Sequence, residues 1–110
     1  MTGDARRTGM VCMLGALCWM FAGCGGTQHG QELFDLHCAD CHSEANPDLK
    51  KQPPKLEGLF RSKTLPSGAP ATDQQLRKTI VEGLGTMPAF DRRLSENDVN
   101  DLIQYLHTLK

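Results

Sequence analysis

Five consecutive residues, Cys38-Ala39-Asp40-Cys41-His42, carry the clearest chemistry in this chain of 110 residues. Two thiols separated by two residues can each add to a vinyl group of one porphyrin and form two thioether bonds. A histidine directly after the second cysteine then lies under the iron and can ligate it. The spacing therefore predicts covalent attachment of one c-type haem through Cys38 and Cys41, with His42 on the iron, and hence redox chemistry.

Two other uses of paired cysteines have to be weighed against haem attachment. A Cys-x-x-Cys pair can act as a thioredoxin-type redox couple, but that use needs an alternating strand–helix pattern, which this sequence lacks. A structural zinc site needs a fourth ligand at finger-like spacing. No second Cys/His pair follows the motif, and only His107 remains downstream. Both alternatives are disfavoured on these grounds.

The first 23 residues have the features of an export signal rather than of a folded domain. Arg6 and Arg7 precede an uncharged apolar run from Met10 to Ala22, which Gly23 and Cys24 follow. A basic start, a short apolar core and small residues before a cleavage point are typical of secretory signals. The apolar run is shorter than the roughly 20 residues that a membrane-spanning helix needs.

The segment Phe21-Ala22-Gly23-Cys24 resembles the lipobox of bacterial lipoproteins, in which the cysteine is lipidated and becomes the first residue. Phe21 stands where that family usually has leucine, and a plain cleaved signal peptide is the alternative. We expect residues 1–23 to be a lipoprotein signal peptide, Cys24 to carry the lipid, residues 24–29 to form a flexible tether and residues 30–110 to fold as one domain. The expected location is the outer face of the cytoplasmic membrane or the periplasm.

Removal of the signal changes the composition of the chain. The mature chain keeps three cysteines and a single methionine, Met87. The removed residues include two arginines and one aspartate, so the formal net charge changes from −1 to about −2. A slightly acidic chain gives no sign of a nucleic-acid partner. A domain this small rarely buries enough apolar surface to be stable without an additional stabilising group. A buried porphyrin would supply that stabilisation.

The elements that must position these residues are expected to be helices. Residues 31–41 have a helical pattern, a second helix runs from an N-cap at Thr72 to about Glu82, and Ser95 opens the last helix. A short helix is expected near residues 56–61. The last helix has an apolar stripe made of Val99, Leu102, Ile103, Leu106 and Leu109. No strand-like alternation is present, and the pattern predicts an all-α chain.

With these elements in view, residues 30–110 resemble a class I monohaem cytochrome c. Gly30 and Phe34, with Tyr105 on the last helix, match the crossing of the first and last helices in that family. A missing side chain at such a crossing lets an aromatic ring pack closely. The resemblance implies a small cytochrome c fold, with three main helices and loops wrapped around one covalently attached haem c.

The resemblance also implies two further residues of the haem site. The segment 53–60 is similar to the proline–leucine loop of the family, and by that match the carbonyl of Pro54 accepts the Nδ1–H of His42 and orients its ring. The segment 83–90 resembles the loop that brings the second axial ligand, which implies that Met87 ligates the iron. A thioether is soft and uncharged, so Met/His ligation raises the reduction potential.

The remaining charged and titratable residues are expected at the surface. His29, His37 and His107 are interpreted as surface residues rather than as iron ligands. A basic group in the loop after the haem motif either steers an acidic redox partner or forms a solvated face; it consists of Lys50, Lys51, Lys55, Arg61 and Lys63.

These patterns together predict a membrane-anchored one-electron carrier and not an enzyme. The expected partners are redox donor and acceptor proteins and the membrane, with neither nucleic acid nor a small-molecule substrate. One alternative is a haem c subunit fixed within a larger redox complex. Another is a haem protein, five-coordinate or with a displaceable Met87, that binds peroxide or diatomic gases. That last alternative needs distal acid–base groups, and near Met87 the sequence offers Asp91, Arg92 and Arg93.

Overall fold

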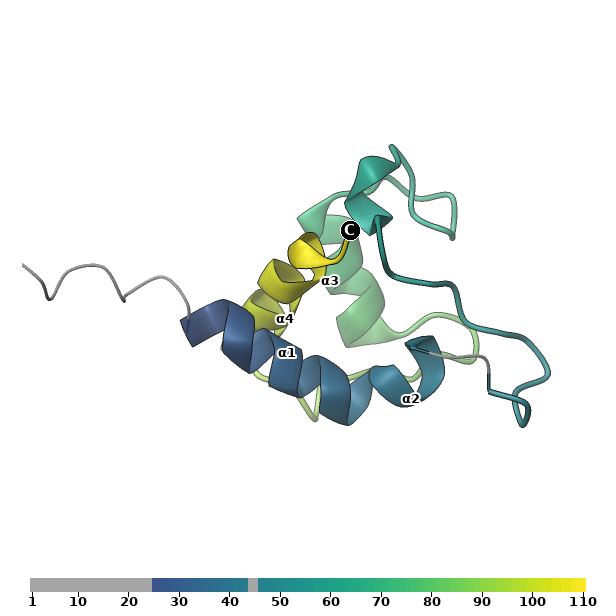
Figure 1. Cartoon of the computed structure of the whole chain (residues 1–110), viewed down its shortest axis with the longest axis horizontal. Helices are drawn as coiled ribbons and strands as arrows, with labels where there is room; N and C mark the ends of the chain where they lie inside the picture. The colour runs from purple at the N-terminus through teal and green to yellow at the C-terminus, as the bar shows by residue number, and fades with distance from the viewer. Residues whose placement is uncertain (1–24, 44–45) are drawn as a thin grey trace, which may run out of the picture.

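The computed structural model describes residues 25–43 and 46–110, and Figure 1 shows their arrangement. The expected signal peptide and the expected lipidation site at Cys24 lie outside these residues. The described chain forms α1 (Gly25–His37), α2 (Ala39–His42), the 3-10 helix η1 (Leu59–Arg61), α3 (Asp73–Glu82) and α4 (Glu96–Thr108). Extended segments in these ranges pair only through isolated bridges, so the predicted all-α fold is confirmed.

Side-chain caps determine where α3 and α4 begin. The hydroxyl oxygen of Thr72 accepts the N–H of Gln75 at 3.2 Å. At the start of α4, the Ser95 hydroxyl accepts the N–H of Asp98 at 3.1 Å, while the Asp98 carboxylate accepts the N–H of Ser95 at 2.9 Å. These two bonds make a capping box. The bond from the N–H of Ser95 ends on the Asp98 carboxylate, so it favours the ionised form and lowers the pKa of Asp98. The helix starts predicted at Thr72 and Ser95 are confirmed.

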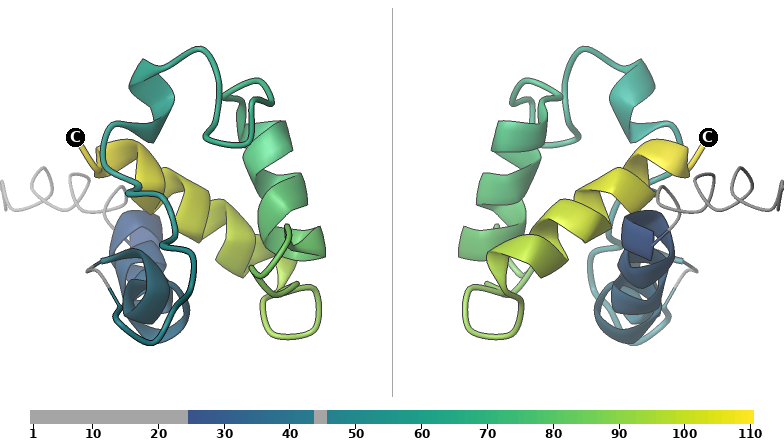
Figure 2. Two further views of the ribbon diagram at one scale, coloured as in Figure 1. Left: turned by 90° about the vertical axis from the view of Figure 1, so that its right-hand side faces the viewer. Right: turned by 90° about the vertical axis from the view of Figure 1, so that its left-hand side faces the viewer.

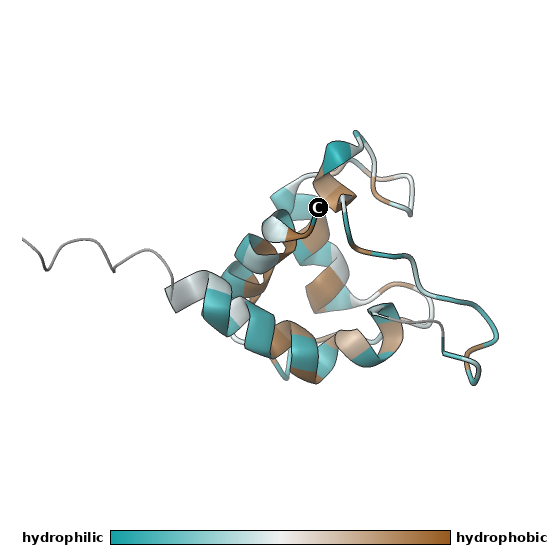
Figure 3. Cartoon of the chain, viewed as in Figure 1, coloured by the Kyte–Doolittle hydropathy of each residue, from teal (hydrophilic) through white to brown (hydrophobic). Residues whose placement is uncertain are grey.

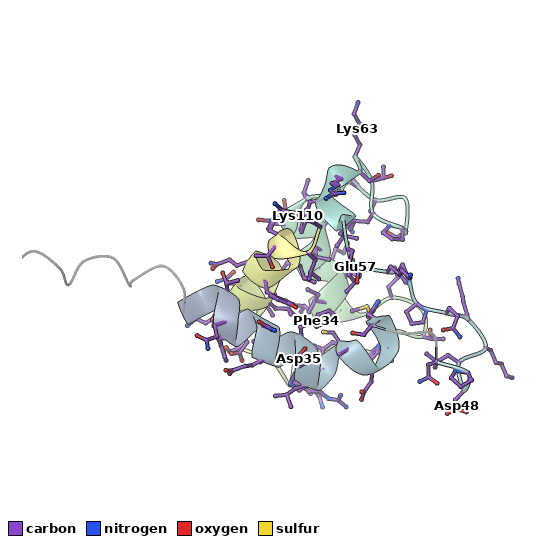
Figure 4. All side chains as sticks on the ribbon, viewed as in Figure 1. Phe34, Asp35, Asp48, Glu57, Lys63 and Lys110 are labelled. Atoms are coloured by element: carbon purple, nitrogen blue, oxygen red, sulfur yellow. The ribbon has the colours of Figure 1, made fainter. Side chains whose placement is uncertain are left out.

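Helices α1 and α4 make their closest approach at Gly30. A Cβ atom at this position would lie 2.9 Å from Cβ of Tyr105 and would collide with the backbone carbonyl of Asp101. One turn further along α1, the ring of Phe34 packs on that of Tyr105 with centroids 5.4 Å apart. Figure 4 shows Phe34 inside the molecule. The crossing expected from Gly30, Phe34 and Tyr105 is therefore confirmed.

Helix α4 is the central element of the core and lies between α1 and α3 (Figure 2). Its inner stripe is 4% exposed or less and consists of Val99, Leu102, Ile103 and Leu106. The facing helices supply Leu33 and Phe34 from α1 and Leu76 and Ile80 from α3. Apolar segments on all three helices are visible in Figure 3. The predicted apolar stripe of the last helix is confirmed, and its final member, Leu109, is partly buried against the core.

The start of α1 differs from the flexible tether predicted for residues 24–29, because residues 25–29 are helical. This first turn packs on α4. The Nδ1 atom of His29 lies 2.9 Å from Oδ2 of Asp101, and a Cβ on Gly26 would meet the side chains of Asp101 and Gln104. These tertiary contacts offset the low helix propensity of Gly25 and Gly26. The sequence pattern alone contains no such contacts and therefore predicts a flexible segment.

The single helix expected over residues 31–41 is divided at Cys38. Helix α1 ends at His37, α2 begins at Ala39, and Cys38 has φ −119°, which departs from the helical value of about −63°. The backbone N–H of Cys38 still donates to the carbonyl of Phe34 at 2.8 Å. The two helices therefore follow each other with a bend at the first cysteine. Among residues 25–43 and 46–110, no helix is both long enough and apolar enough to cross a membrane.

We expect Gly30→Ala to lower the free energy of unfolding by about 1–3 kcal/mol, because the added methyl group must force the α1 and α4 backbones apart. Urea denaturation of the haem-loaded protein measures the change. Gly25→Ala is the matched control, since a Cβ atom there would have no heavy atom within 4 Å. Equal effects of the two substitutions would contradict the packing assigned to Gly30.

The contact between His29 and α4 makes stability depend on pH. The hydrogen bond to Asp101 raises the pKa of His29, and the nearby charges of Asp98 and Glu32 add to this effect. A raised folded-state pKa contributes stability that is fully present below the ordinary value near pH 6.5 and is lost as the pH rises through the folded value. We expect His29→Gln to destabilise the protein more at about pH 5.5 than at about pH 8.5, as measured by urea denaturation. Gln28→Ala, at an exposed position, should show no such pH dependence, and a pH-independent effect of His29→Gln would contradict the expectation.

Candidate functional site

The two motif cysteines lie one helical turn apart at the junction of α1 and α2. Cys38 occupies the bend and Cys41 lies in α2, where its backbone N–H donates to the carbonyl of Cys38 at 3.2 Å. Both thiols are free, with Cys38 half-buried and Cys41 exposed. Cys38 also packs against the core cluster. The arrangement presents two sulfur atoms on one short segment, next to an apolar wall.

The environment of Cys38 disfavours its thiolate in the folded chain. Burial raises the pKa of Cys38 to about 11, and the neighbouring Cys41 adds to the shift. The thiolate is the reactive form of cysteine, and an unburied thiol has a pKa near 8.5. Burial thus keeps Cys38 in its less reactive, protonated form in the folded chain.

His42 is oriented by a main-chain acceptor from a distant loop. Its Nδ1 atom lies 2.8 Å from the carbonyl oxygen of Pro54. A carbonyl can only accept, so Nδ1 carries a proton, and in the neutral imidazole Nε2 is then the nitrogen with the free electron pair. This contact leaves Nε2 as the nitrogen available to a metal, and such a bond raises the basicity of the ring.

Met87 lies in a tight turn between α3 and Phe90. The backbones of Leu84 and Met87 exchange two hydrogen bonds of 3.1 and 3.0 Å. Gly83 ends α3 with φ +77°, and a Cβ on it would lie 2.7 Å from the carbonyl oxygen of Met87, so this turn requires glycine. Phe90 closes the loop by donating its N–H to Ile80 at 3.0 Å. The turn holds Met87 half-buried against the core.

The cysteine segment and the methionine loop are neighbours in the fold. The ring of His37, directly before Cys38, contacts the ring of Phe90 edge-on with centroids 5.9 Å apart. Cys38, Leu56 and Met87 all pack against the same buried cluster. The structure therefore brings the motif, the loop that carries Pro54 and the loop that carries Met87 around one apolar region.

These residues fit a covalently attached porphyrin better than a bare metal ion. They offer two adjacent thiols, an imidazole with one nitrogen tied to a carbonyl, and a thioether on a separate loop. Within residues 25–43 and 46–110, no three His, Cys, Asp or Glu side chains lie close enough to hold a metal ion. That finding gives no support to a structural zinc site.

A surface groove of the described residues lies elsewhere. It is an open groove between α3 and the start of α4, lined among others by Thr72, Arg77, Val81 and Glu96. Neither motif cysteine nor Met87 contributes to this groove. The residues singled out by the sequence therefore form a site of their own.

The other histidines have structural partners that sequence patterns do not reveal. His107 stacks on the ring of Phe60 with centroids 3.7 Å apart, and its Nε2 lies 2.7 Å from Oδ1 of Asp73. It thereby joins α4 to η1 and α3. No local motif marks these contacts, because each partner is more than 30 residues away along the chain.

Comparison with known proteins identifies the family. A sequence profile described as "Cytochrome C oxidase, cbb3-type, subunit III" matches residues 25–106. The "Cytochrome bc1 complex cytochrome c subunit" of Corynebacterium diphtheriae is 32% identical over 74% of this chain and 26% of its own length. The corresponding protein of Mycobacterium leprae is 35% identical over 73% of this chain and 25% of its own length. The chain thus spans about a quarter of the length of these relatives.

Smaller cytochromes match over most of their length. Cytochrome c6 of Bumilleriopsis filiformis is 25% identical over 72% of this chain and 86% of its own length. The structure of cytochrome c6 from the diatom Phaeodactylum tricornutum superimposes with a TM-score of 0.53 at 25% identity, covering 73% of this chain and 88% of that chain. Cytochrome c6C from Synechococcus sp. PCC 7002 superimposes with a TM-score of 0.50 at 21% identity, over 71% and 89%, which supports the fold alone. With its fold and matched residues, this chain belongs to the monohaem cytochrome c family, whose members are non-enzymatic electron carriers with one covalently bound haem c.

Proposed function

We propose that this chain is a membrane-anchored one-electron carrier whose haem is held by Cys38 and Cys41 and ligated by His42 and Met87. The observation that carries the proposal is the 2.8 Å contact between Nδ1 of His42 and the Pro54 carbonyl. It leaves Nε2 of His42 as the nitrogen free to ligate iron, on the residue that directly follows Cys41.

Each residue has a distinct part in this proposal. Cys38 and Cys41 would hold the haem by each adding their S–H across one of its vinyl double bonds, an addition that would consume no oxidant and release nothing. Pro54 keeps the ring of His42 in one tautomer and orientation. Met87 supplies a soft, uncharged sulfur that favours the ferrous state. When bound, the haem supplies a reversible one-electron couple, and the surrounding chain supplies ligands, burial and a docking surface.

The anchoring part of the proposal rests on residues 21–24 and on the position of α1. Cys24 directly precedes Gly25, the first residue of α1. A lipid on Cys24 would hold the α1 end of the domain at the outer face of the cytoplasmic membrane or, for a lipoprotein of the outer membrane, in the periplasm. Redox partners in the same membrane would then meet the carrier at high effective concentration.

The relatives favour a second candidate, a haem subunit fixed within a larger redox complex. Several matched proteins are named as cytochrome c subunits of a bc1 complex, and the family is named after an oxidase subunit. We propose that a bc1 complex and a cbb3-type oxidase are the electron donor and acceptor of this chain. A free carrier elutes from a detergent-exchanged size-exclusion column as a small species, whereas a fixed subunit elutes with its complex.

We expect Met87→Ala to remove the weak far-red absorption band that marks methionine sulfur on ferric haem, and to lower the reduction potential, because the sulfur that favours ferrous iron is lost. Optical spectroscopy and potentiometric titration measure the two changes. Leu84→Ala is the matched control, since Leu84 lies in the same turn and is 55% exposed. A band that persists in Met87→Ala, or that the parent protein lacks, would exclude Met87 as the ligand.

Mass spectrometry of the exported protein tests attachment and anchoring together. We expect the mass of residues 24–110 plus one haem plus acyl chains, because all three modifications are covalent. Cys24→Ser should lose the acyl mass and leave the membrane fraction while keeping the haem. Cys38→Ser should instead reduce the number of thioether links to one. A pigment that acidic solvent extracts from the denatured parent protein would overturn covalent attachment.

A further inference from the structure

The loop between His42 and Pro54 contains a hydrogen-bonded clasp made by Gln52. Its Oε1 accepts the N–H of Asn46 at 3.0 Å, and its Nε2 donates to the carbonyls of Asn46 at 2.7 Å and Leu49 at 3.1 Å. Leu49 also donates its N–H to the carbonyl of Asn46 at 3.1 Å. The side chain of Gln52 therefore pairs with the backbone of Asn46 on both its donor and its acceptor side, as a neighbouring strand would.

This clasp lies inside the loop that the His42–Pro54 contact closes. His42 pairs with Pro54, and within that span Asn46 pairs with Gln52. With the clasp formed, only short segments separate the two pairs. Without the clasp, the loop that must close is about twice as long, which lowers the equilibrium constant for forming the His42–Pro54 contact about threefold.

The residues between the clasp and the acceptor are stiff. Pro53 and Pro54 directly follow Gln52, and each proline ring fixes its own φ near −65°. The residue before a proline is also restricted, which applies to both Gln52 and Pro53. Because the backbone from Gln52 to Pro54 has little conformational freedom, the position of Gln52 largely determines the position of the Pro54 carbonyl.

We propose that Gln52 is a positioning residue that holds the Pro54 carbonyl against Nδ1 of His42 and thereby sets how strongly His42 donates electrons to the haem iron. This inference rests on the proposed ligation by His42. A firm bond at Nδ1 makes the imidazole a more basic ligand and stabilises ferric iron. Loosening that bond makes the reduction potential more positive.

The test compares Gln52→Leu, which keeps a side chain of similar size without hydrogen bonds, with the parent protein in its haem-loaded form. Proton NMR of the ferrous protein measures solvent exchange of the His42 Nδ1–H, and potentiometry measures the reduction potential. We expect exchange to become about threefold faster and the potential to become more positive. Gln74→Leu removes an exposed amide from α3 and should change neither quantity.

The outcomes separate this inference from the proposed function. A parent protein without the far-red methionine band, or with extractable pigment, contradicts the proposed ligation or attachment of the haem. A normal parent protein with unchanged exchange and potential in Gln52→Leu overturns the positioning role and leaves the proposed function intact. A lower melting temperature in Gln52→Leu without change in exchange or potential also overturns it, because Gln52 would then only stabilise the loop.

Discussion

The contact of two helix backbones at Gly30 is the constraint on which the rest of this structure depends. Because Gly30 has no side chain, α1 lies directly on the α4 backbone at Asp101. The ring of Phe34 then fills the space beside the crossing and meets Tyr105. The end of α1, which leads into Cys38, is thereby fixed relative to the core. A larger residue at the crossing would displace the site as well as the helix.

The helices alone do not make the site, because two of its elements belong to loops that main-chain contacts hold in place. The carbonyl of Pro54 fixes the ring of His42, and the clasp of Gln52 shortens the loop that carries that carbonyl. On the other side, Gly83 lets the chain turn so that Met87 packs against the core. Under the proposed ligation by His42 and Met87, ligands held this way would change little in geometry when the charge on the iron changes, which suits an electron carrier.

Long-range contacts of the histidines stabilise this small domain in addition to its apolar core. His29 attaches the start of α1 to Asp101 of α4, and His107 joins α4 to Phe60 and Asp73. In a lipoprotein the contact of His29 would lie next to the anchor. The first turn of α1 would then move together with the domain and would not act as a flexible tether between the lipid and the domain.

The sequence by itself determined the all-α cytochrome c fold and the starts of the last two helices. The spacing of Cys38, Cys41 and His42 predicts haem attachment because the motif is local in sequence. Caps such as Thr72 and Ser95 mark helix starts because their hydrogen bonds span three residues. Only the tertiary structure decided that residues 25–29 are helical, that the chain bends at Cys38 and that Gln52 closes its loop. Those outcomes depend on contacts between residues distant in sequence or on loop geometry, and no local pattern encodes them.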